Sequence, residues 1–310
     1  MAAQPPAPAP RAPWRNYRII SGGHHGCVRT VAFDPSNHLF FTGAGDRTVK
    51  GTRRLTLTGH VGEVRALAVS HRHPYLFSAG DDGEDLEHNQ AVRSYHGHLA
   101  GVHCLAFHPA IDVLITSGGD AICRVWDVRT RAQVFALAGH PALGSLARAT
   151  DPQVITGSHD ATIQLWDLAA GKTMLTLAHH KKSIRAMALH PAERSRSAFA
   201  SAAADGVKKF SLPGGELLQN MSPPPQQTRT ILNSLALNQS NVGAAGGGDD
   251  GIIRFLDWRS GHCFQQEMAI VHPGSLESEA CICAVSFDVT GSRLYTCGAD
   301  KTIKMWRELY

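Results

Sequence analysis

The histidines and aspartates of this 310-residue chain are the side chains best suited to chemistry, and they recur at regular spacing. The clearest sets, each a histidine, an aspartate and a tryptophan, are His98, Asp120 and Trp126, and His140, Asp160 and Trp166. A histidine can act as a general base, but catalysis also needs other groups that converge in the same pocket. The sequence contains no Gly-x-Ser-x-Gly, His-Glu-x-x-His or phosphate-loop pattern. In the absence of such a pattern, we predict a protein that is not an enzyme and has no catalytic residue.

Two other features could suggest a ligand site. The seven cysteines are odd in number and include no Cys-x-x-Cys pair, so we expect reduced thiols and no metal site. The glycine-rich segment 246–251 could cradle a phosphate, but no lysine follows it and it coincides with a repeated turn, so we expect a turn. We therefore predict no cofactor and no small-molecule substrate.

The repeated turn sets the expected fold. A turn of small residues that ends in aspartate occurs seven times, and the last aspartates are Asp46, Asp82, Asp120, Asp160, Asp205, Asp250 and Asp300. Seven units with a period of about 40 to 45 residues, marked by Gly-His and Trp-Asp pairs, are typical of a WD-repeat β-propeller. Each unit would supply four short strands, and stacking the blades in a ring buries both faces of every sheet. The prediction is an all-β, seven-bladed propeller.

The two ends of the chain predict how the ring closes. The last unit stops after its third strand, at Trp306, whereas residues 17–20 form an unpaired strand before the first Gly-His pair. We expect this N-terminal strand to complete the last blade. Residues 14–310 would then form one propeller domain, preceded by a disordered Pro- and Ala-rich N-terminus over residues 1–13.

Units one and two are shorter than units three and four. From the turn aspartate to the next repeat histidine, unit one takes 14 residues and unit two takes 16, against 20 in each of the next two units. The Trp-Asp pair is missing from both. We therefore expect shortened third and fourth strands in blades one and two.

In WD-repeat proteins, which these units resemble, the histidine, the turn aspartate, a serine or threonine and the tryptophan form a buried hydrogen-bonded set. The resemblance assigns to this structural set His98, Asp120, Trp126, His140, Asp160, Trp166, Asp300 and Trp306.

Loop sequences carry a narrower resemblance, to the pleiotropic regulator one family of spliceosomal WD-repeat proteins. They include Pro-Tyr-Leu-Phe-Ser at 74–78, His-Pro-Ala-Ile-Asp-Val-Leu at 108–114, Gln-Val-Ile-Thr-Gly-Ser-His-Asp at 153–160 and His-Pro-Gly-Ser-Leu-Glu-Ser-Glu at 272–279. The resemblance implies a non-enzymatic protein-interaction scaffold in pre-mRNA splicing. It also implies a nuclear location, with proteins of the spliceosome-associated nineteen complex as partners.

The same resemblance implies an alternative function. Plant members of the family are described as substrate receptors of cullin-RING ubiquitin ligases, which hold an adaptor through a Trp-Asp-x-Arg box. Trp126, Asp127 and Arg129 match that box.

Other candidate partner-binding residues lie in loops. Lys181 and Lys182 either form a solvated face or contact an RNA backbone within an assembly. His272, Pro273 and Glu277 lie in the longest unit, in a segment that either binds a partner or covers a blade edge. The net charge of +4 is too small to indicate nucleic-acid binding by the chain as a whole. No run of about 18 apolar residues predicts a membrane span.

Overall fold

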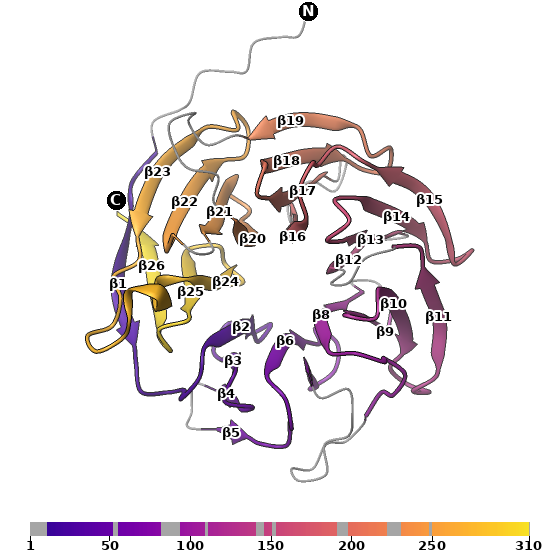
Figure 1. Ribbon diagram of the computed structural model, residues 1–310, viewed down its shortest axis with the longest axis horizontal. Helices are drawn as coiled ribbons and strands as arrows, with labels where there is room; N and C mark the ends of the chain where they lie inside the picture. The colour runs from indigo at the N-terminus through magenta and orange to yellow at the C-terminus, as the bar shows by residue number, and fades with distance from the viewer. Residues whose placement is uncertain are drawn as a thin grey trace, which may run out of the picture.

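Short antiparallel strands, grouped into sheets that stand around a ring, make up the protein (Figure 1). The computed structural model describes residues 11–51, 55–81, 94–108, 111–140, 146–150, 153–190, 198–221, 231–247 and 250–309. Over these ranges six sheets have four strands and one has two, and the one helix is the 3-10 turn η1 (Glu277–Ala280). No helix in these ranges is long and apolar enough to cross a membrane. The all-β propeller predicted from the repeats is confirmed.

The strands follow one another through the sheets in chain order. The first sheet contains β2 (Val28–Phe33), β3 (Phe40–Ala44), β4 (Val49–Gly51) and β5 (Thr56–Leu57), and the second contains β6 (Val64–Val69) and β7 (Leu76–Gly80). The third contains β8 (Val102–Phe107), β9 (Val113–Gly118), β10 (Ile122–Asp127) and β11 (Gln133–Ala138), and the fourth contains β12 (Leu146–Thr150), β13 (Gln153–Gly157), β14 (Ile163–Asp167) and β15 (Lys172–Leu177). The fifth contains β16 (Ile184–Leu189), β17 (Ala198–Ala203), β18 (Gly206–Ser211) and β19 (Leu217–Met221), and the sixth contains β20 (Leu232–Leu237), β21 (Val242–Gly247), β22 (Ile252–Asp257) and β23 (Cys263–Met268). The seventh contains β24 (Ile282–Phe287), β25 (Arg293–Gly298), β26 (Ile303–Glu308) and, from the other end of the chain, β1 (Trp14–Ile20).

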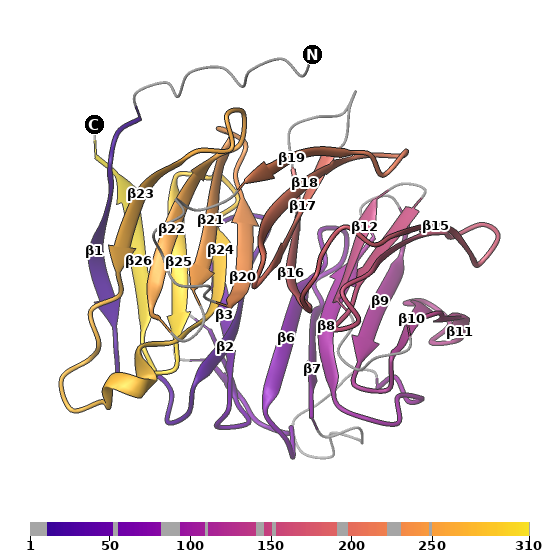
Figure 2. The ribbon, with the colours of Figure 1, turned by 45° about the horizontal axis from the view of Figure 1, so that its top comes forward.

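The first strand of each of the first six sheets, together with β24, lies innermost (Figures 1 and 2). Each innermost strand contacts the innermost strand of the next sheet, and β24 contacts β2. Apolar side chains fill the spaces between sheets, as where Val125 and Leu137 of the third sheet pack with Val154 and Trp166 of the fourth. Burial on both faces explains why β9, β13 and β17 are almost entirely made of buried residues.

The N-terminal strand lies beside the C-terminal one. β1 pairs antiparallel with β26, with Trp14 opposite Glu308 and Ile20 opposite Ile303. It begins three residues earlier than the sequence predicted, because Trp14 is buried (1% exposed) and stacks on Phe255 of the sixth sheet with ring centroids 5.6 Å apart. The strand therefore joins the two ends of the chain and also packs against the neighbouring sheet.

The first two sheets differ from the rest. In the first, β4 has three residues and β5 has two, which agrees with the predicted shortening of the outer strands. In the second, most of the stretch between β7 and the next Gly-His pair, where shortened third and fourth strands are expected, lies at residues 82–93, outside the described residues. The described part of the chain thus forms six four-stranded blades and the two-stranded sheet β6–β7, where we expected seven blades.

The predicted disordered N-terminus, residues 1–13, falls outside the described residues as far as residue 10. Residues 11–13 are described, and Arg11 donates through Nε to Asp257 at 3.1 Å. Arg11 thus lies against the sixth sheet, and the Pro13 carbonyl accepts from the Leu309 backbone N–H at 2.9 Å.

Candidate interaction surfaces

A chain of hydrogen bonds runs from the core of the third blade to its turn. Trp126 Nε1 donates to Thr116 Oγ1 at 2.8 Å, this oxygen lies 2.7 Å from His98 Nε2, and His98 Nδ1 lies 3.0 Å from Asp120. The indole N–H can only donate, so the Thr116 oxygen accepts from it. The Thr116 hydroxyl then donates its own hydrogen bond to His98 Nε2. His98 then carries its proton on Nδ1 and donates it to Asp120. Burial lowers the pKa of His98 although Asp120 opposes the shift, so the neutral imidazole that this chain requires is favoured.

The fourth blade repeats the arrangement. Trp166 Nε1 donates to Thr156 Oγ1 at 2.8 Å, Thr156 lies 2.8 Å from His140 Nε2, and His140 Nδ1 lies 2.9 Å from Asp160. The structure thus brings together each of the two complete sets that the sequence singled out.

The seventh blade has the tryptophan and the aspartate but no histidine. Trp306 Nε1 donates to Thr296 at 3.1 Å, and Asp300 accepts instead from Lys304 Nζ at 2.6 Å. Lys304 and Asp300 are both buried, and the lysine ammonium supplies the hydrogen bond that the histidine donates to the aspartate in the third and fourth blades. In this blade no histidine connects the Trp306–Thr296 hydrogen bond to Asp300.

The resemblance to WD-repeat proteins implied a serine or threonine in each set but did not say which residue it is. The spacing would have identified it, because a serine or threonine lies four residues before the turn aspartate, at Thr42, Ser78, Thr116, Thr156, Ser201 and Thr296. Two further histidine sets follow the same spacing, namely His24 with Thr42 and Asp46, and His180 with Ser201 and Asp205.

These hydrogen bonds hold the turn aspartates in their charged form. Burial raises the pKa of Asp46, but bonds from the Thr48 hydroxyl, the His25 backbone N–H and His24 outweigh it and lower the pKa to about 2. The pKa of Asp205 is also lowered to about 2, by bonds from His180, the Lys181 backbone N–H and Lys208, against the effect of burial.

The charged aspartates fix the segment that leads into the first strand of their own blade. We call the face of the ring that carries the aspartate turns the turn face. The backbone N–H after the repeat histidine, or at the equivalent position, donates to the aspartate in His25 to Asp46, Leu99 to Asp120, Lys181 to Asp205 and His272 to Asp300. Leu99 is 88% exposed, and Val61, which follows His60 in the same way, is 68% exposed. Each of these four bonds thereby anchors one residue on the turn face.

Most of the predicted partner-binding residues lie on the turn face. Lys181 and Lys182 are exposed there, before β16. His272 is half-buried, with Nδ1 donating to the Pro273 carbonyl at 2.9 Å, and Pro273 is exposed. Glu277 is the first residue of η1.

The Trp-Asp-x-Arg box lies at the other end of its blade, at the hairpin between β10 and β11. Trp126 is only 3% exposed and belongs to the core, whereas the Arg129 side chain is 75% exposed. Asp127 accepts from the Arg129 backbone N–H at 2.8 Å. We call this opposite side of the ring the hairpin face. Of the three residues, Arg129 is the one most open to direct contact with a partner.

Known proteins share this architecture. The protein-family model described as "WD domain, G-beta repeat" matches residues 16–50, 51–84, 89–127, 131–167 and 271–307. The protein pleiotropic regulator PRL2 of Arabidopsis thaliana is 56% identical over 319 residues, which cover 99% of this chain and 65% of that protein. The pre-mRNA-splicing factor PRP46 of Candida glabrata is 44% identical over 310 residues, which cover 96% of this chain and 71% of that protein.

A third relative extends the comparison. The pre-mRNA-splicing factor PRP46 of Debaryomyces hansenii is 41% identical over 313 residues, which cover 95% of this chain and 74% of that protein. This chain thus spans 65% of the length of PRL2 and somewhat more of the two PRP46 proteins. The matches extend over the whole ring, and they confirm the resemblance seen in the loop sequences. The chain belongs to the WD40-repeat family and, within it, to the family of the pleiotropic regulator proteins and PRP46 pre-mRNA-splicing factors.

Proposed function

We propose that this protein is a non-enzymatic protein-interaction scaffold in pre-mRNA splicing, which acts in the nucleus as part of the nineteen complex. The observation that carries the proposal is the 44% identity, over 96% of this chain, to a protein named pre-mRNA-splicing factor. A rigid ring with anchored side chains on its faces is suited to holding several proteins at once.

The scaffold we propose is a single ring of seven units over residues 14–310. The sheet β6–β7 would be the inner half of a thin second blade, since β6 contacts β2 on one side and β8 on the other. β1 would close the ring by pairing with β26.

The turn face is the proposed docking surface for splicing proteins. Leu99 and Val61 place two large apolar side chains in water, and the backbone N–H of Leu99 is held by Asp120. Because their backbones are already ordered, a partner that covers them gains apolar burial with little further ordering of this chain. We therefore expect a partner segment with apolar side chains to cover them.

Affinity purification of the tagged full chain from nuclear extract tests the proposal. Spliceosomal proteins and small nuclear RNAs should copurify, and Leu99→Arg should reduce their recovery several-fold by placing a charge in the interface. The matched control is Leu218→Arg, since Leu218 is 51% exposed on the outermost strand β19. Loss of recovery that is equal in both variants, or no splicing component with the unaltered chain, would refute the proposal.

The substrate-receptor alternative depends on Arg129. Its exposed guanidinium on the hairpin face is the feature that favours contact with a cullin-RING adaptor. In the same purification, adaptor and cullin that are lost with Arg129→Ala and kept with Leu99→Arg would support this second function. Their absence from the eluate would argue against it.

Contact with RNA inside the assembly is a finer proposal for Lys181 and Lys182. Two exposed ammonium groups on the turn face can bind phosphates without reading a base sequence. Replacing both by alanine should weaken ultraviolet crosslinking to RNA and reduce its dependence on salt.

A further inference from the structure

A β-bulge recurs at one place in six of the seven innermost strands that the structure describes. In each, the pairing register shifts by one residue directly after the first paired residue. A bulged residue has no partner opposite, and the local twist turns its side chain in a new direction. The bulged residues are Arg29 in β2, Arg65 in β6, His103 in β8, Arg185 in β16, Asn233 in β20 and Cys283 in β24.

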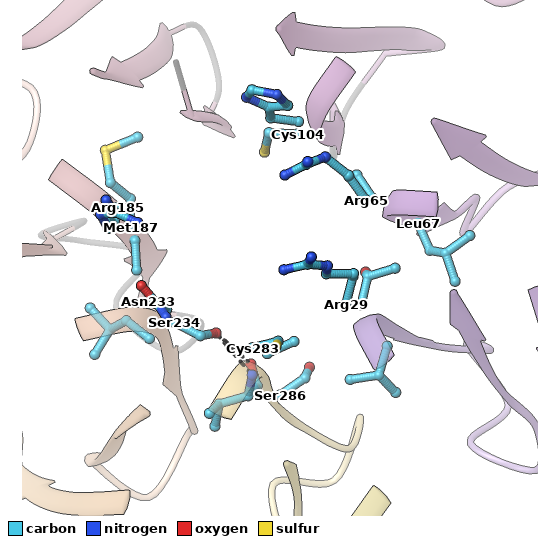
Figure 3. Close-up of a pocket in the computed structure, with 18 of the residues that line it drawn as sticks. Arg29, Arg65, Leu67, Cys104, Arg185, Met187, Asn233, Ser234, Cys283 and Ser286 are labelled. Atoms are coloured by element: carbon cyan, nitrogen blue, oxygen red, sulfur yellow. Dashed lines mark hydrogen bonds between the residues drawn. The ribbon is translucent and has the colours of Figure 1, made fainter. Parts of the chain in front are cut away.

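All six bulged residues line a cavity of about 410 Å³ at the centre of the ring (Figure 3). Arg29 and Arg65 extend into the open space from one side, and Arg185 lies across from them (Figure 3). The three guanidiniums therefore come from three different sheets and approach the same space.

The charge around this cavity is positive. No aspartate or glutamate is among the described residues that line it. Glu63 and Asp81 flank it, with Glu63 Oε2 3.1 Å from Arg29 Nη2 and Asp81 Oδ1 2.6 Å from Arg65 Nε. Arg185 makes no ion pair within the described residues, and the buried Arg29 Nε has no acceptor there. The ring of bulges thus leaves unused donors and an excess of positive charge.

The other titratable groups of the cavity do not cancel this charge. Burial lowers the pKa of His103 and of His159, and the neighbouring Arg65 and Arg185 lower them further, so both imidazoles are mainly neutral at pH 7. A hydrogen bond with Cys281, together with burial, raises the pKa of Cys283, so this thiol carries no negative charge.

We propose that the central channel binds a compact, multiply charged phosphate compound, held by Arg29, Arg65 and Arg185. Guanidiniums match phosphate oxygens in geometry as well as charge. A compact anion can contact three groups that converge from different directions, and the cavity volume lies in the usual range for small-molecule sites, about 300 to 1,000 Å³. The described lining residues include no phenylalanine, tyrosine or tryptophan on which the bases of RNA could stack. A small phosphate compound therefore fits better than a nucleic acid strand, and the proposal goes beyond the scaffold function.

Calorimetry with the full chain and tripolyphosphate as the probe tests this site. We expect binding that weakens about tenfold in Arg185→Ala, since one charged hydrogen-bonding group is lost, and an intermediate affinity in Arg185→Lys. Arg185 is exposed, so its replacement should leave the thermal midpoint unchanged. The matched control is Arg259→Ala, which removes an exposed arginine at the turn between β22 and β23 and should leave binding unchanged.

Two results would overturn the proposal. One is equal tripolyphosphate affinity in Arg185→Ala and Arg259→Ala. The other is binding of single-stranded RNA or of an acidic peptide that depends on Arg185 while tripolyphosphate does not bind. A parallel titration with ATP separates two sources of the phosphate. An ATP affinity equal to that of tripolyphosphate indicates a free polyphosphate as the ligand, and a higher ATP affinity indicates a nucleotide. Either result supports the site. The readout is direct binding, so its failure is distinct from failure of the splicing proposal.

Discussion

Thr116 shows how much one small polar residue does in this fold. Its hydroxyl accepts a hydrogen bond from Trp126 Nε1 and donates one to His98 Nε2, so one buried hydroxyl satisfies two buried ring nitrogens. An unsatisfied buried polar group costs more than a single hydrogen bond gains. The stability of the third blade should therefore depend strongly on this oxygen.

Thr116→Val tests this dependence with little change in shape. We expect a loss of about 2 to 3 kcal/mol in the free energy of unfolding, because Trp126 Nε1 and His98 Nε2 both lose their partner. The matched change is Thr296→Val in the seventh blade, where the hydroxyl meets Trp306 and no histidine set, and about 1 kcal/mol should be lost. Urea unfolding of both variants measures the difference. Equal losses would contradict the two-partner role.

Stability should also depend on pH through the repeat histidines. Burial lowers the pKa of His24, His98 and His180 from 6.5 in the folded protein. Below about pH 6.5 the unfolded chain then binds more protons than the folded one, so stability falls as the pH is lowered. The thermal midpoint should be highest at neutral pH and decline toward about pH 5. A midpoint that stays constant over that interval would show that these histidines do not titrate as proposed.

At the scale of elements, β1 is more than the edge of a sheet. Trp14 packs between Phe255 and Phe287, and its backbone N–H donates to Gln265 of β23 at 2.7 Å. Trp14→Ala should therefore cost about 3 to 5 kcal/mol in the free energy of unfolding. The control is Tyr17→Ala on the same strand, which removes a 39% exposed ring that lies against Arg307 and should cost under about 1 kcal/mol. Similar losses would mean that the packing of Trp14 does not stabilise the ring.

The shortened outer strands of the first sheet should open more easily than their counterparts. β4 and β5 have three and two residues, against six in each of β10 and β11, so fewer hydrogen bonds hold them. Hydrogen exchange followed by mass spectrometry should show faster deuterium uptake over residues 49–51 and 56–57 than over residues 122–127 and 133–138. Equal protection would show that length does not limit local stability here.

Sequence spacing predicted the parts of the fold that are repeated and missed the parts that depend on register. The turn aspartates and Gly-His pairs indicated the ring, and Trp306 with four residues after it indicated that the closing strand comes from the other end. The bulges that turn Arg29, Arg65 and Arg185 into the channel could not be predicted, because a bulge is a property of two paired strands. A signal was nevertheless present, since each of these arginines lies five residues after a repeat histidine.

At the scale of the whole molecule, a ring closed by β1 need not remain a stable monomer once that strand is removed. A chain of residues 21–310 would expose the backbone of β26, and an open sheet edge favours pairing with another copy. We expect this truncated chain to self-associate and to melt at a lower temperature. A synthetic peptide of residues 11–20, added in trans, should restore the monomer, because Trp14 and the β26 ladder can form again without a covalent link. The same peptide with Trp14→Ala should restore it poorly. Light scattering and thermal unfolding measure both effects, and a truncated chain that stays monomeric with an unchanged midpoint would show that the ring holds without its closing strand.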